Sequence, residues 1–167
     1  MEREFNLRDG ERVKKIGAFK LVNGKEVECA GPVLSYLEFN ERLIVLLNWY
    51  HASNLYDIYR NIFCYAKSDG HLIWQIEQPF HSETGALLEE VFKNIKLYIR
   101  QNDGSYKRFG DQNKYPWDDV VAGSSYPKPF RPGIDRLETM TWSQFPQEYY
   151  VDYETGKLTW FAKHQKI

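Results

Sequence analysis

No stretch of this sequence is apolar for long enough to cross a lipid bilayer as a helix. The longest apolar run, LIVLLNW at residues 43–49, is far short of the roughly 20 residues that such a helix needs. The segment MEREFNLRDGERVKK is strongly charged and holds no apolar core of the kind found in secretory signals. We therefore expect a cytoplasmic protein with no membrane partner.

Charge of one sign is not in excess either. The chain has 22 Lys and Arg residues against 23 Asp and Glu residues, which gives a net charge of −1. A general nucleic-acid-binding protein shows a basic face or stripe that neutralises phosphates. This charge balance argues against direct nucleic-acid binding.

The residues that hold metals are few and scattered. Cys29 and Cys64 are the two cysteines, and neither belongs to a C-x-x-C pair. The four histidines show no i, i+2 or i, i+4 spacing of the kind that zinc sites use. We expect both cysteines to be buried and reduced, and we expect no metal and no cofactor.

Motifs for nucleophilic or phosphoryl-transfer chemistry are also missing, since neither G-x-S-x-G nor a glycine-rich phosphate loop is present. Cys64 lies between Phe63 and Tyr65 in a strand-like stretch, where an apolar setting keeps a thiol protonated and inert. Histidine beside a carboxylate would suit acid–base work. Two such pairs are candidates for a hydrolase: His81 with Glu83, and His51 with Asp57.

Aromatic residues, in contrast, are plentiful, with 12 Tyr, 10 Phe and 5 Trp among 167 residues. Such residues favour strands, where flat rings pack on a pleated surface. We predict a single β-rich domain over residues 1–167. Its fold class is mainly β and antiparallel, with one short helix, arranged as a curved sheet, a sandwich or a partly open barrel.

The local patterns predict the elements of this domain. Asn23-Gly24 is typical of a hairpin turn between strands at 13–22 and 25–30. Alternation predicts strands at 33–39 and 137–142, and the continuous apolar run at 42–50 predicts a central strand covered on both faces. The one expected helix covers 83–92, where Leu87, Leu88 and Val91 would share a face.

One phrase occurs twice, as YAKSDGHLIWQI at 65–76 and VDYETGKLTWFA at 151–162. In each, a turn glycine (Gly70 or Gly156) is followed two and four residues later by Leu and Trp. Glycine takes the left-handed turn conformation without steric cost, and a period of two puts Leu and Trp on one face. We predict two hairpins with buried Leu72, Trp74, Leu158 and Trp160. A third hairpin is expected around Gly104.

The repeated phrase resembles the strand–turn–strand signature of quinoprotein-type propeller blades over residues 63–76 and 149–162. Propeller blades recur every 40-odd residues, and at least four are needed. Because this chain is too short for that, the resemblance implies blade-like hairpins in one antiparallel sheet system, without a quinone or metal site.

The stretch 110–136 holds four prolines and three glycines, which predicts a long irregular loop. Exposed aromatics and acids on such a loop are typical of protein interfaces. We predict a partner-binding face made of Asp111, Tyr115, Trp117, Asp118, Asp119, Tyr126 and Phe130. A second candidate face is WYHASNLYDIYR at 49–60.

The charged first segment, the mid-chain hairpin and the final D-x-E-T-G-K-L hairpin together resemble small cytosolic bacterial immunity proteins, which accompany polymorphic or contact-dependent toxins. The resemblance implies a non-catalytic protein that blocks the active site of one cognate toxin. A nuclease toxin would present a basic groove, which Asp111, Asp118 and Asp119 would suit. Two other functions stay open: a β-domain enclosing a small molecule, and the His–carboxylate hydrolase.

Overall fold

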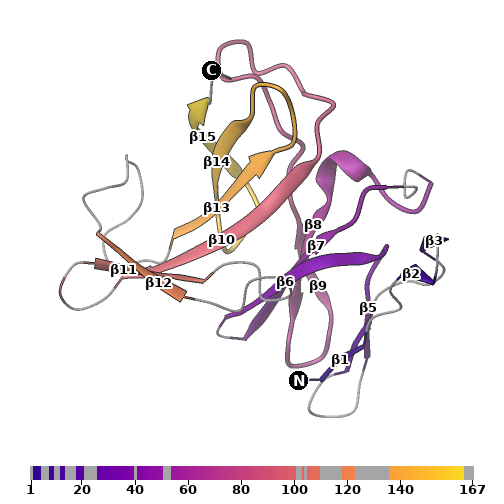
Figure 1. Ribbon diagram of the computed structural model, residues 1–167. Helices are drawn as coiled ribbons and strands as arrows, with labels where there is room; N and C mark the ends of the chain where they lie inside the picture. Colours follow the sequence, from indigo (N-terminus) through magenta and orange to yellow (C-terminus); the bar gives the residue numbers. More distant parts are fainter. Residues whose placement is uncertain are drawn as a thin grey trace.

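A computed structural model gives the structure of the protein (Figure 1). It describes residues 2–4, 8–9, 12–13, 18–20, 26–39, 41–50, 54–100, 103, 105–109, 118–122 and 136–163.

The larger layer is a six-stranded antiparallel sheet, which runs from pink to yellow in Figure 1. Strand β10 near its centre is the longest, and it pairs with β11 on one side and β13 on the other. The order is β12 (Asp118–Ala122), β11 (Ser105–Phe109), β10 (Phe92–Arg100), β13 (Arg136–Thr141), β14 (Gln147–Val151) and β15 (Leu158–Lys163).

The second layer is a four-stranded antiparallel sheet in the order β6 (Val33–Phe39), β7 (Arg42–Leu47), β8 (Ile62–Ala66) and β9 (Leu72–Gln75). A 3-10 turn, η1 (Ile58–Arg60), lies between β7 and β8. Two smaller sheets precede this layer: one joins β1 (Glu2–Glu4), β4 (Ala18–Lys20) and β5 (Glu26–Glu28), and the other joins β2 (Arg8–Asp9) and β3 (Arg12–Val13).

The main core lies between the two large sheets. Side chains from β6, β7, β8 and β9 meet side chains from β10, β13, β14 and β15 in one buried cluster. Its largest fully buried members include Tyr149, Phe92, Leu37 and Ile44. Among the described residues, the two outer strands of each large sheet do not pair with each other, so neither sheet closes into a barrel. The fold is therefore mainly β and antiparallel, as predicted, and of the three predicted arrangements it is consistent with the sandwich.

Strand β7 shows why the four-stranded sheet is buried on both faces. Ile44 and Leu46 point into the main core, whereas Leu43, Val45 and Leu47 belong to a second cluster on the opposite face. All five are at most 1% exposed. This confirms the prediction that the apolar run forms a central strand covered on both sides.

The predicted hairpins are confirmed by pairing. β4 pairs with β5, β8 with β9, β10 with β11, and β14 with β15. The first strand of the first hairpin is shorter than the predicted range 13–22. Val13 belongs to β3 and residues 18–20 form β4, and these two strands belong to different sheets. Gly70 and Gly156 have positive φ angles of 81° and 75°, as predicted. Gly104 lies outside the described residues.

The predicted helix at 83–92 is wrong. Gly85 has a φ of +73°, a left-handed conformation that no α-helix accommodates. Residues 79–88 instead fold back on themselves: Leu88 donates its backbone N–H to Pro79, and Phe80 forms an isolated β-bridge with Leu87. Leu87, expected on a buried helix face, is 66% exposed. The only helical element among the described residues is η1.

The prediction of an unbroken irregular loop at 110–136 is also wrong in part. Asp118–Ala122 forms strand β12, which pairs antiparallel with β11 as the outer strand of the six-stranded sheet. The flanking segments 110–117 and 123–135 lie outside the described residues. The run DDVVA contains two β-branched residues, Val120 and Val121, which suit a strand despite the prolines and glycines around it.

The two cysteines are free and buried, as expected. Burial raises the pKa of the Cys29 thiol to about 12, against a smaller lowering by a hydrogen bond with Tyr65. Burial likewise raises the pKa of Cys64 to about 11. Among the described residues there is no helix whose length and apolar character would let it span a membrane.

Candidate functional site

The first predicted face falls largely on residues that the structure does not describe. Asp118 and Asp119 are the described members, and they occupy β12 opposite Phe109 and Arg108 of β11. They therefore stand on an outer strand and not on a loop. The remaining members lie outside the described residues: Asp111, Tyr115, Trp117, Tyr126 and Phe130.

Three residues of the second candidate face, at 49–60, support the fold. Tyr56 packs against Gly31 and Phe63, and its hydroxyl donates to the Asn48 carbonyl at 2.9 Å. The Asp57 carboxylate accepts the Tyr59 N–H and caps η1. The Arg60 guanidinium donates to the Ile76 carbonyl at 2.8 Å. These contacts account for the three side chains without a partner protein.

The first two residues of that segment belong to an exposed aromatic surface. The ring centroids of Trp49 and Trp142 are 6.3 Å apart, and Trp142 is 62% exposed. The Lys93 ammonium lies 5.6 Å above the centre of the Trp142 ring. Tyr50 and Phe145, close to these tryptophans in sequence, are 57% and 46% exposed. We call Trp49, Lys93 and Trp142 the tryptophan patch.

Buried Asn61 brings the parts of the patch together. Its side-chain amide donates to the carbonyls of Leu47, at the end of β7, and Phe92, at the start of β10. Its side-chain oxygen accepts the Phe92 N–H at 2.9 Å. Because Asn61 is fully buried, these bonds are protected from water. Trp49 follows Leu47 by two residues and Lys93 follows Phe92 by one, so these anchors hold both near Trp142, whose ring contacts each of them.

The turn between β13 and β14 is anchored at both ends. Trp142 donates its backbone N–H to the Val91 carbonyl at 2.8 Å. Gln147, which is buried, donates its backbone N–H to the Thr141 hydroxyl and its side-chain amide to the Phe145 carbonyl. The patch thus consists of exposed rings on fixed backbone, the arrangement that binding surfaces favour.

Sequence reasoning identified Trp49 but missed Lys93 and Trp142. Trp142 is the last residue of the strand predicted at 137–142. Lys93 directly follows the helix predicted at 83–92. One signal was present: the run WSQFP at 142–146 places two aromatics beside Pro146, outside any strand alternation. The pairing of these residues with Trp49 depends on the side-chain bonds of Asn61, which no local pattern shows.

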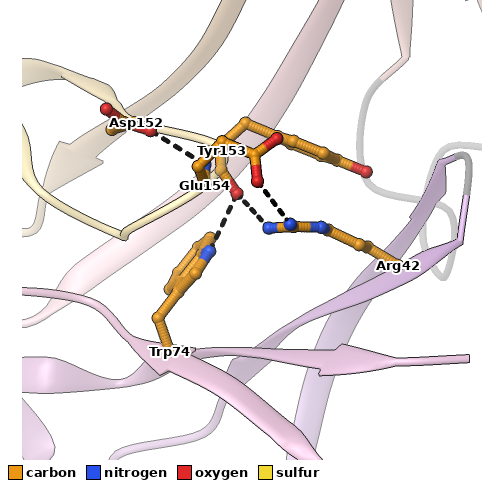
Figure 2. Close-up of polar contacts among 5 residues, drawn as sticks. All are labelled: Arg42, Trp74, Asp152, Tyr153 and Glu154. Carbon is orange, nitrogen blue, oxygen red and sulfur yellow. Dashed lines mark hydrogen bonds and ion pairs between the residues drawn. The ribbon is translucent and has the colours of Figure 1, made fainter.

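A second polar cluster joins the two repeated hairpins (Figure 2). The Tyr153 carbonyl accepts two hydrogen bonds, from the Trp74 indole at 2.9 Å and from the Arg42 guanidinium at 2.5 Å. Arg42 also pairs with the Glu154 carboxylate at 2.6 Å and lies 4.7 Å from the centre of the Tyr153 ring. The Glu154 backbone N–H donates to Asp152.

This cluster holds the sheets together and has no feature of a reaction centre. The Tyr153 carbonyl has both of its lone pairs occupied. The Cys64 thiol beside Arg42 remains protonated near neutral pH, since burial raises its pKa more than the Arg42 charge lowers it. Such a thiol is a poor nucleophile. The cluster therefore joins strand β7 and the β9 hairpin to the β14–β15 turn.

The predicted His81–Glu83 pair does not form between the side chains. Nδ1 of His81 accepts the backbone N–H groups of Glu83 and Thr84, so its ring supports the turn. His51 lies outside the described residues. A pair that was not predicted joins His71 to Asp69 at 2.5 Å, with both side chains at least half exposed. This pair lies in the β8–β9 turn, where Asp69 also accepts the His71 backbone N–H.

The described residues contain no group of three or more His, Cys, Asp and Glu side chains that would hold a metal ion. Comparison of the chain with protein-family models, with curated proteins and with solved structures found no match. The function is therefore inferred from the residues of the molecule itself.

Proposed function

We propose that this protein is a non-catalytic protein-binding domain and that the tryptophan patch is one of its binding faces. The observation that carries this proposal is Trp142, a tryptophan that is 62% exposed beside a second tryptophan on anchored backbone. Tryptophan gives a large contact area at small conformational cost and is enriched at the energetic centres of interfaces. A soluble protein gains nothing in stability from exposing such a ring.

The partner that we propose is a cognate bacterial toxin, which this protein would neutralise by covering the toxin's active site. Support for this identity comes from the resemblance to small immunity proteins. Inhibition by covering a site needs a stable surface and no chemistry of its own. The anchored turn at 142–146 and the anchored end of β7 supply such a surface.

The second proposed face is the predicted one at 110–136, with Trp117 at its centre and acids at Asp118 and Asp119. If the toxin is a nuclease, these carboxylates would meet Lys or Arg in its basic groove. Association through them would slow as salt rises, because charge steering is screened. The two faces thus differ in the effect of salt as well as in their residues.

The test is a titration of the protein against the product of the adjacent gene, followed by calorimetry. We expect binding by the wild type and a loss of at least about 2 kcal/mol in Trp142→Ala if the tryptophan patch is central. Trp117→Ala and Asp118→Ala/Asp119→Ala report on the other face. Leu87→Ala is the matched control, because Leu87 is also 66% exposed but lies in a different turn.

Two results would contradict the proposal. One is a lack of binding to any neighbouring gene product, in the presence of a folded wild-type protein. The other is hydrolase or nuclease turnover by the protein alone. If binding occurs but only the Trp117 and Asp118/Asp119 variants lose it, the function stands and the face at 110–136 replaces the tryptophan patch.

A further inference from the structure

The polar side-chain atoms of Trp49, Lys93 and Trp142 are all hydrogen-bond donors. Each indole has one N–H, and the ammonium has three N–H bonds; none of the three side chains has an acceptor. Their side chains make ring contacts with one another and no hydrogen bond or ion pair with any described residue. The centre of the patch therefore presents donors and one positive charge, and no side chain among the described residues accepts a hydrogen bond from them.

The Lys93 ammonium gives the tryptophan patch its positive charge. This ammonium lies over the Trp142 ring, 5.6 Å from the ring centre, which is close enough for a cation–π contact. Salt bridges among the described residues involve other side chains, Arg42 with Glu154 and His71 with Asp69. A carboxylate from outside would pair with an ammonium that is already held over the Trp142 ring.

We propose that the tryptophan patch binds a protein segment in which an Asp or Glu side chain lies beside an apolar side chain. This inference rests on the proposed protein-binding function and specifies the chemistry of the partner. The apolar side chain would cover the part of the Trp142 ring that Lys93 leaves exposed. The carboxylate would accept hydrogen bonds from the Lys93 ammonium and from an indole N–H.

The same geometry disfavours a cationic occupant. A quaternary or primary ammonium prefers a ring face with negative potential, and here Lys93 already occupies that position over Trp142. A second cation would be repelled by the first. The patch should therefore distinguish ligands by charge, even when their apolar parts are the same.

Three small probes of matched shape separate these possibilities: 3-phenylpropionate, 3-phenylpropanamide and 3-phenylpropylamine. The indole N–H signals of the full-length protein are followed by NMR during titration with each probe, after assignment with Trp49→Phe and Trp142→Phe. We expect the carboxylate to shift both signals and to bind about two- to fivefold more tightly than the amide, as for an exposed ion pair. We expect the amine to bind most weakly.

Variants assign the charge preference to its residue. Lys93→Met keeps the apolar stem without the charge, so the carboxylate and the amide should then bind equally. Trp142→Ala should lose both. Lys157→Met is the matched control, because Lys157 is an exposed lysine in the β14–β15 turn, and it should retain the wild-type preference.

Equal affinity of the three probes for the wild type, or tightest binding of the amine, would overturn the inference. So would a carboxylate preference that persists in Lys93→Met. These measurements need no natural partner, so their failure is separate from failure of the titration against a neighbouring gene product. A partner that binds at 110–136, together with probes that ignore charge, would leave the proposed function and reject this inference.

Discussion

Asn61 shows how one buried polar residue places a surface. Its side chain bonds backbone groups at the end of β7 and at the start of β10, two strands that belong to different sheets. An apolar residue of similar size would leave the Phe92 N–H and two carbonyl groups unsatisfied in the interior, which is costly. The contact between Trp49 and Trp142 depends on this placement, so the surface and the core are coupled through Asn61.

Glycine replacements offer a sharp comparison at the residue scale. Gly85 and Gly156 have nearly the same positive φ, but an added Cβ at Gly85 meets nothing within 4 Å, whereas at Gly156 it would lie 2.6 Å from Cε3 of Trp74. Gly85→Ala should cost about 1–2 kcal/mol in the free energy of unfolding, from backbone strain alone. Gly156→Ala should cost about 1–3 kcal/mol more, because Trp74 is buried and must shift.

Urea denaturation of the two variants measures this difference. Equal losses would mean that Trp74 moves aside freely, and the close contact between the two repeated hairpins would then have no energetic weight.

At the scale of elements, the two repeated hairpins are alike in sequence but differ in register. In the second, Val151 faces Leu158 and Tyr149 faces Trp160, so Leu and Trp share the core face as predicted, but Trp160 is only partly buried. In the first, Cys64 faces Trp74, and the next residue of β8, Tyr65, faces Leu72. Strand β9 therefore has one extra residue between Leu72 and Trp74. This bulge turns Leu72 away from the core and leaves it 49% exposed.

The prediction for these residues is corrected accordingly. Trp74, which is 6% exposed and donates to Tyr153, should cost about 3–5 kcal/mol when replaced by Ala. Leu72→Ala should change stability by less than about 0.5 kcal/mol, as at other surface positions. Thermal and chemical unfolding of the two variants checks the contrast. A large loss in Leu72→Ala would show that the bulge is absent in solution.

The elements that could be predicted from sequence are those set by local chemistry. Turn glycines at Gly70 and Gly156 and the apolar run of β7 specify conformation within a few residues. The helix predicted at 83–92 does not form. Its apolar spacing suits a helix, but the left-handed conformation of Gly85 interrupts it. The bulge in β9 could not be predicted, since it arises from pairing with β8 and leaves no mark in the strand itself.

At the scale of the whole molecule, the site was less predictable than the fold. Trp49, Lys93 and Trp142 come from three distant parts of the chain and meet because two sheets pack and Asn61 joins them. Alternation identifies a core face, but it does not show which strand ends lie together. Within the candidate face at 49–60, the Tyr50 side chain is exposed. Tyr56 and Arg60 instead hydrogen-bond to backbone carbonyls of the fold.

Both faces of the four-stranded sheet hold a buried thiol, Cys64 in the main core and Cys29 in the outer cluster. Each has a pKa raised by burial, to about 11 and about 12, from an ordinary value of 9.0. The folded state therefore keeps its protons where the unfolded chain loses them. This contribution to stability is complete below pH 9 and is lost as the pH rises from 9 toward 11 and 12.

We therefore expect the free energy of unfolding to fall by roughly 2 kcal/mol between pH 8 and pH 10, measured by urea denaturation under reducing conditions. Cys29→Ala/Cys64→Ala should be less stable at pH 8 because two cavities form, but its stability should decline much less with pH. Tyr149, whose pKa burial raises to about 12 from 10.0, adds its effect mainly above this range. A wild-type protein whose stability is constant from pH 8 to 10 would show that water reaches both thiols, and thus that the two faces of this sheet are less completely covered than the packing of β7 indicates.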